Sequence, residues 1–120
     1  MGLYTDTKIY RAARELMLAV VKHLRSLPRD YQVSLGYDAR RAARGIVILI
    51  YRANSAWDQA KLPHLQELLE LLEDLKLTLR ICDELGLISH DQHAEEIHLM
   101  ESVGRQATGL RDHFAGAPVG

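Results

Sequence analysis

The sequence has few of the residues that build disulfides, stacking surfaces or membrane spans. Cys82 is the only cysteine in 120 residues, which excludes an internal disulfide and leads us to expect a reducing, cytoplasmic setting. One Trp, five Tyr and one Phe are too few for a platform on which nucleic-acid bases stack. No apolar run reaches the roughly 18 residues that a membrane span needs, and the N-terminus lacks a signal-peptide layout. We therefore expect no membrane partner.

The sequence also lacks the common catalytic motifs. It has no glycine loop that would hold a phosphate and no strand-to-helix turn that would present a nucleophile. Cys82 lies in a stripe of leucines, which is typical of a small core residue, and the neighbouring Asp83 and Glu84 would raise its thiol pKa rather than lower it. We expect neither enzymatic activity nor a cofactor.

One alternative is a helical bundle with a metal or small-molecule site in its core. Glu95 and His98 form a single Glu-x-x-His pair, the half-motif of di-iron bundles, but no second pair follows. Two polar residues three positions apart on an exposed helix are the simpler interpretation. His90 and His93 share one edge of a helix, with no third and fourth ligand at local spacing.

Apolar residues recur every three or four positions and predict an all-α protein without a sheet. Four helices are expected near residues 6–26, 34–54, 63–85 and 89–113. The signals for their ends are Asp6 and Ser34 as N-caps, Pro63 in a first turn, Gly86 as a C-cap, and Ser89 with Gln92 as a capping box. Short connections predict an antiparallel, up-down-up-down four-helix bundle over residues 1–114, with a flexible tail at 115–120.

The predicted core stripes follow from this periodicity. They are Ile9, Ala13, Leu16, Val20, Leu24 and Leu27 in the first helix; Leu65, Leu68, Leu69, Leu72, Leu75, Leu79 and Cys82 in the third; and Ile97, Met100, Val103, Ala107, Leu110 and Phe114 in the fourth. The second helix differs, because its six consecutive apolar residues, Ile46 to Tyr51, leave no polar face at about 100° per residue. We expect this segment to contact both the core and another subunit.

Charge is distributed unevenly along the chain although the net charge is only −1. Residues 1–60 carry ten basic and five acidic side chains, and residues 61–120 carry five basic and eleven acidic ones. Such asymmetry either serves a charged partner or lets basic helices pack beside acidic ones. The basic residues that could form one patch for a nucleic-acid backbone are Arg40, Arg41, Arg44 and Arg52 with Lys76 and Arg80. Alternatively, Lys76 and Arg80 pair with Glu73, Asp83 or Glu84.

A family resemblance adds to these inferences. Ser34-Leu35-Gly36, Ala42-Ala43 and Leu49-Ile50-x-Arg52-Ala53-Asn54 resemble, in order and spacing, the second helix of the accessory variability protein (Avd) of bacterial diversity-generating retroelements. The likeness continues through Lys61, Leu65, Glu67, Leu72, Leu75-Lys76, Leu79-Arg80, Leu85-Gly86-Leu87-Ile88, Gly104-Arg105 and Gly109. It covers about residues 4 to 113 and extends more broadly to the four-helix-bundle proteins encoded in ribosomal-RNA intervening sequences.

The resemblance implies a homopentameric barrel of four-helix protomers with no catalytic centre. Such a barrel would bind the retroelement's reverse transcriptase and its template RNA, and would support mutagenic copying. By position, Lys76 and Arg80 match a basic pair on the family's third helix, and Arg40 matches a basic residue on its second. The charge pattern adds Arg44 and Arg52 to the expected binding residues.

Overall fold

Four long helices make up most of the protein. The computed structural model describes residues 7–116, in which no residue lies in a β-strand. The long helices are α1 (Lys8–His23), α3 (Tyr37–Ser55), α4 (Leu62–Glu84) and α5 (His90–Ala115). A short helix α2 (Arg29–Tyr31) and a π-helical segment (Gln32–Gly36) lead into α3, and a 3-10 turn (Asp58–Lys61) leads into α4. The prediction of an all-helical chain with four helices is confirmed.

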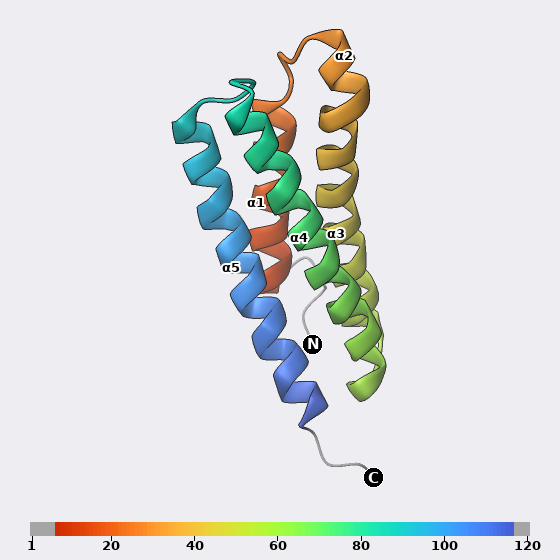
Figure 1. Ribbon diagram of the computed structural model, residues 1–120. Coiled ribbons are helices and arrows are strands. Elements are labelled where there is room, and N and C mark those ends of the chain that lie inside the picture. Colours follow the sequence, from red (N-terminus) through yellow and green to blue (C-terminus); the bar gives the residue numbers. More distant parts are fainter. Residues whose placement is uncertain (1–6, 117–120) are drawn as a thin grey trace.

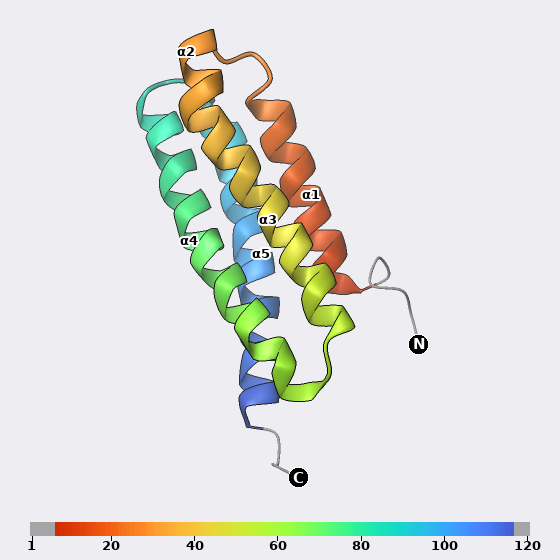
Figure 2. The ribbon, with the colours of Figure 1, turned by 90° about the vertical axis from the view of Figure 1, so that its right-hand side faces the viewer.

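The four helices lie side by side in an elongated body about 53 Å long and 23 Å across (Figure 1). The chain rises along α1, descends along α3, rises along α4 and descends along α5. Helices α1 and α4 each pack against both α3 and α5. Figure 2 shows the same arrangement from the side, with α3 between α1 and α4. Consequently α1 and α4 occupy opposite corners of the bundle.

The core lies along the axis between these helices. Every residue of the predicted α1 stripe is buried, as are all those of the predicted α4 stripe except Leu69, which is partly covered. The stripe predicted for α5 is wrong at one position: Ile97 is 40% exposed, and Glu96 occupies the inward position. Glu96, Met100, Val103 and Ala107 are spaced by four, three and four residues, so they share one face of α5. Ile97 lies about 100° around the helix from Glu96.

The long apolar run of α3 is divided between the core and the surface. Ile46, Leu49 and Ile50 are buried, whereas Val47 and Ile48 are only partly covered and Tyr51 is exposed. The expected contribution to the core is therefore present. The expected contact of this segment with another subunit stays a prediction.

Several helix ends form where local chemistry predicted them. Ser89 accepts a hydrogen bond from the Gln92 backbone N–H at 3.0 Å, while the Gln92 side chain accepts one from the Ser89 N–H at 3.0 Å, which completes the capping box. Gly86 has a φ of +72°, the left-handed conformation that ends α4. Asp6 lies outside the described residues, and Thr7 caps α1 by accepting from the Tyr10 N–H.

The predicted start of the second helix at Ser34 is wrong. The Ser34 hydroxyl instead donates to the Asp30 carbonyl at 2.7 Å, inside a helical stretch that already begins at Arg29. Pro28 explains the earlier start, because its fixed φ suits the residue that precedes a first turn. α1 also ends at His23, earlier than the predicted residue 26, whereas α5 continues to Ala115, where the tail was expected to begin. Residues 117–120 of that tail lie outside the described residues.

Among the described residues, no helix combines the length and the apolar character that crossing a bilayer requires.

Two glycine-to-alanine substitutions should move stability in opposite directions. Gly86→Ala forces an L-residue into a left-handed conformation, so we expect a loss of about 1 kcal/mol in the free energy of unfolding. Gly109→Ala lies inside α5 with no atom within 4 Å of the added Cβ, so we expect a gain of up to about 1 kcal/mol. Urea denaturation followed by circular dichroism measures both. A stabilised Gly86→Ala variant would contradict the assigned turn.

Candidate nucleic-acid interface

Arg40 has a structural role in the region between α1 and α3. Its guanidinium donates to the Gln32 side-chain oxygen at 2.8 Å and to the Gln32 carbonyl at 3.1 Å. The Gln32 amide in turn donates to the carbonyls of Leu24 and Arg25 at 3.0 and 2.8 Å. These carbonyls follow the end of α1, where backbone acceptors lack helical partners. Arg40 therefore ties the π-helical segment to the end of α1 and is only partly accessible.

The other predicted residues of α3 are exposed. Arg44 lines a groove between α3 and α4, together with Arg41 of α3 and with Glu67 and Asp74 of α4. Arg52 lies in the last turn of α3. Within residues 7–116 neither Arg44 nor Arg52 makes a side-chain hydrogen bond or ion pair. Both charges are therefore available to an anionic ligand.

Lys76 and Arg80 each have an acidic partner on the same helix. Lys76 Nζ lies 3.1 Å from Glu73, and Arg80 Nε lies 3.3 Å from Glu84. Exposed ion pairs at these spacings stabilise a helix by about 0.3–0.5 kcal/mol each. A ligand phosphate can therefore replace Glu73 or Glu84 as the partner of the basic side chain. The two basic side chains border one hollow between α4 and α5, together with His93, Ile97, Met100 and Glu101. The structure thus brings these two predicted binding residues together at one groove.

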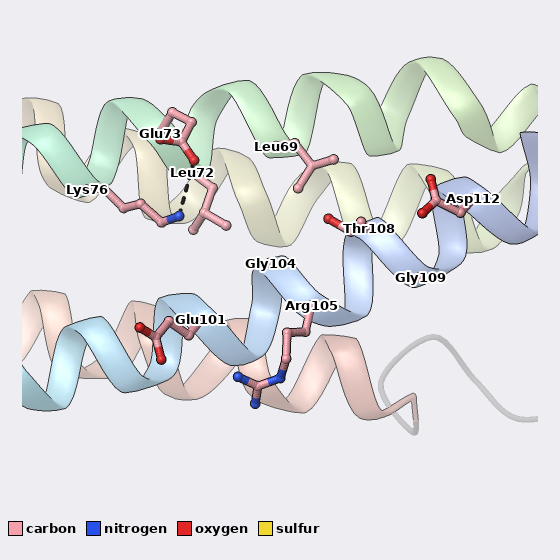
Figure 3. Close-up of a pocket in the computed structure, with 10 residues that line it drawn as sticks. All are labelled: Leu69, Leu72, Glu73, Lys76, Glu101, Gly104, Arg105, Thr108, Gly109 and Asp112. Atoms are coloured by element: carbon pink, nitrogen blue, oxygen red, sulfur yellow. Dashed lines mark hydrogen bonds and ion pairs between the residues drawn. The ribbon is translucent and has the colours of Figure 1, made fainter.

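A longer groove continues along α4 and α5 (Figure 3). Lys76 and Glu73 line it from α4, and Glu101 and Arg105 line it from α5. Gly104 allows α5 to pack closely against α4, since a Cβ at this position would lie only 3.3 Å from Leu72 Cδ2. With charges of both signs along its walls, this groove has no clear preference for an anion.

A further group of basic side chains lies on α1, and none of them was among the predicted binding residues. Five basic residues lie in or just beyond this helix and all are exposed: Lys8, Arg11, Arg14, Lys22 and Arg25. Among the described residues, none of the five makes an ion pair. Glu15 is the only acidic residue of α1.

A sequence signal could have pointed to this surface. The tetrapeptide Arg-Ala-Ala-Arg occurs at residues 11–14 and again at 41–44. In both copies the two arginines are exposed, and at least one of the alanines is buried against the core. An aliphatic residue follows each copy four positions later and a basic residue eight positions later, which keeps these side chains on the same outer face.

A buried histidine–glutamate pair connects α1 to α5. His23 Nδ1 lies 2.7 Å from Glu96 Oε2, and Glu96 is fully buried. The second ring nitrogen, Nε2, lies 3.3 Å from the exposed Glu95. Burial raises the pKa of Glu96, which the hydrogen bond and charge of His23 only partly offset. Glu96 Oε1 has no hydrogen-bond partner among the described residues. This contact was not predicted, because it joins positions 73 residues apart.

A second carboxylate joins the end of α4 to the start of α5. Asp83 Oδ2 lies 2.9 Å from His93 Nδ1, and Asp83 Oδ1 lies 2.7 Å from His90 Nδ1. Burial alone would raise the pKa of Asp83, but the hydrogen bonds and charges of the two histidines lower it below its usual value. The predicted edge formed by His90 and His93 therefore holds an aspartate.

The side chains considered for catalysis or metal binding have simpler surroundings. Cys82 is buried, as predicted, and burial, followed by the negative charge of Glu96, raises the pKa of its thiol. Glu95 and His98 are both exposed. Over residues 7–116, no group of three or more His, Cys, Asp or Glu side chains is arranged to hold a metal ion.

Neither a scan of protein-family models nor a search of curated proteins finds a match to this chain. Its function therefore has to be inferred from its residues and their geometry.

Glu96→Ala should be far more destabilising than the same change at its exposed neighbour Glu95. It leaves His23 buried without its closest partner and leaves a cavity, so we expect a loss of about 3–5 kcal/mol. Glu95→Ala removes an exposed side chain and should change the free energy of unfolding by less than about 1 kcal/mol. Denaturant unfolding compares the two variants, and equal effects would show that the buried pair contributes little.

Asp83→Asn should change how stability depends on pH. A carboxyl group whose pKa is lowered by folding stabilises the protein above its ordinary pKa of about 3.9, and that contribution disappears as pH falls through the folded-state value. The variant should therefore be less stable than the parent at neutral pH, and the difference should shrink in acid. Glu101→Gln is the control, at an exposed position of α5 that makes no ion pair within residues 7–116. A difference that is the same at pH 3 and pH 7 would contradict this assignment.

Proposed function

We propose that this chain is a non-catalytic accessory protein of a diversity-generating retroelement. In this proposal it is a cytoplasmic, antiparallel up-down-up-down bundle that assembles into a homopentameric barrel. Its exposed basic side chains bind the element's reverse transcriptase and the template-repeat RNA, and thereby support mutagenic reverse transcription. The resemblance along residues 4 to 113 is one support.

The observation that carries the proposal is the exposure of the basic residues on a helical scaffold. Arg44, Arg52 and Arg80 are exposed, and Lys76 is partly exposed at the border of a groove. Backbone recognition needs fixed positive charge but no base-stacking surface, which agrees with the low aromatic content. Symmetric assembly would repeat each basic side chain around a ring and concentrate the charge. Screening beyond about 8 Å at physiological salt makes such local charge more important than the net charge of −1.

The proposed role requires no reaction centre in this chain. A helical accessory protein acts by binding, and its effect on the polymerase depends on where the contacts lie. Arg40 fits this role less well than the other basic residues, because its guanidinium already binds Gln32. Weak pairing leaves Lys76 and Arg80 free to exchange Glu73 and Glu84 for phosphates or acidic side chains.

Two variants of α4 test the proposal in opposite directions. Lys76→Glu with Arg80→Glu should weaken RNA binding and lower the slope of log affinity against log salt by about 0.7–0.9 for each lost phosphate contact. Glu73→Gln with Glu84→Gln keeps both bases and removes their acidic partners, so binding should be equal or tighter. Titration with template RNA at two salt concentrations and a pull-down with the cognate reverse transcriptase measure the two interactions.

The charge-reversed variant must remain helical by circular dichroism for this comparison. Loss of only one ligand would identify the partner that these residues contact. If the reversed variant binds both ligands as tightly as the parent, the contact surface lies elsewhere.

A further inference from the structure

The outward face of α1 combines exposed apolar residues with a basic border. Leu18 and Val21 are 52% and 41% exposed on this face. Arg11, Arg14 and Lys22 lie on the same side of the helix, since at 100° per residue these five side chains fall within an arc of about 100°, and Arg25 follows just beyond the end of α1. The charges around the apolar pair are therefore mostly basic, although Glu15 and Glu95 share a hollow with Leu18 and Lys22. An apolar centre with a charged rim is the usual composition of a protein–protein contact. We call this surface the α1 face.

The outward face of α4 also combines exposed apolar residues with charge, but here the charge of the helix is negative and lies before the apolar pair. Arg41 and Arg44 of α3 border this surface, in the groove that Glu67, Asp74 and Leu77 line. Leu77 is 61% exposed and Ile81 is partly exposed one turn later. Glu67, Glu70 and Asp74 lie on the same side of the helix, and among the described residues none of the three makes an ion pair. The basic residues of α4, Lys76 and Arg80, lie towards α5 beside their glutamate partners. We call the surface of Leu77, Ile81, Glu67, Glu70 and Asp74 the α4 face.

The two faces cannot meet within one chain. α1 and α4 lie at opposite corners of the bundle, each between α3 and α5 (Figures 1 and 2). Their outward surfaces therefore point away from each other. A mostly basic face and a mostly acidic face on opposite sides of one molecule can pair only between copies.

We propose that the α1 face of one copy docks on the α4 face of the next copy. The assignment rests on the assembly included in the proposed function and specifies which surfaces form the contact. Two different faces meet, so the interface is heterologous and each copy keeps one free face for a further neighbour. Repetition gives a closed ring or an open chain rather than a symmetric dimer.

The composition of the α1 face favours a second copy over nucleic acid as its occupant. A phosphate backbone would contact the basic rim and leave Leu18 and Val21 uncovered. The α4 face covers both features, with Leu77 against the apolar centre and the carboxylates against the rim. Opposite charges across such a contact also select the pairing, because two α1 faces or two α4 faces repel each other.

Charge reversal of one face at a time tests the contact, and reversal of both faces is the decisive comparison. The first variant reverses every base of the α1 face: Arg11→Glu, Arg14→Glu, Lys22→Glu and Arg25→Glu. The second reverses every acid of the α4 face: Glu67→Lys, Glu70→Lys and Asp74→Lys. The third carries all seven changes, which exchanges the charges of the two faces. Sedimentation velocity at micromolar concentration and two salt concentrations measures self-association.

We expect each single-face variant to associate at least about tenfold more weakly than the parent. The seven-substitution variant should recover the parent's assembly, because its faces are again opposite in charge. It should not co-assemble with the parent protein, since every mixed contact would bring like charges together. The matched control reverses two arginines of α5, Arg105→Glu and Arg111→Glu, which belong to neither face, and should assemble like the parent.

Three results would overturn the inference: a monomeric parent, a single-face variant that assembles like the parent, or no recovery in the seven-substitution variant. Weaker RNA binding with unchanged assembly in the α1 variant would assign that face to nucleic acid instead. The test of this contact between copies can fail or succeed independently of the test of the proposed function. Assembly can follow the charges of the two faces even if no reverse transcriptase binds, and the polymerase can bind an oligomer that forms through other surfaces.

Discussion

The structure depends on burying four apolar stripes around one axis. Each helix presents such a stripe, and the residues that meet between them, such as Leu16, Ile46, Leu75 and Val103, are almost completely excluded from water. Burial at about 25 cal/mol per Å² of apolar surface is the main favourable contribution to folding. Because the stripe of each helix must face the axis, the direction of every other side chain follows. Core packing thus places the basic residues of α1 and the acidic residues of α4 on the outer surface.

Features that depend on neighbouring residues could be predicted from the sequence. The α1 stripe, the capping box at Ser89 and the left-handed Gly86 all form as expected, since each depends on spacing within one helix or turn. Two predictions failed for different reasons. Ser34 lies inside a helical stretch that begins earlier, after Pro28, which is a local signal. Glu96 replaces Ile97 in the core, where it pairs with His23, 73 residues away in the chain. Local patterns of hydrophobicity do not reveal a polar partner on another helix.

The candidate interface could be predicted only in part, for a similar reason. Charge pattern and resemblance selected Lys76 and Arg80, and their glutamate partners at three and four positions were foreseeable. Arg40 appeared to be a surface charge because its contact with Gln32 depends on the irregular start of α3. The α1 face was not predicted, because the net charge of the chain gives no sign of a helix in which Glu15 is the one acidic residue among several basic ones. The repeated Arg-Ala-Ala-Arg was the available signal.

The central claim is that this bundle acts as an assembled, binding accessory protein of a reverse transcriptase. Native mass spectrometry of the purified protein, alone and mixed with the cognate polymerase, tests it most directly. The account predicts a single closed oligomer, most simply of five copies, whose mass increases by that of the bound polymerase. A spectrum containing only monomers, with no complex after mixing, would contradict it.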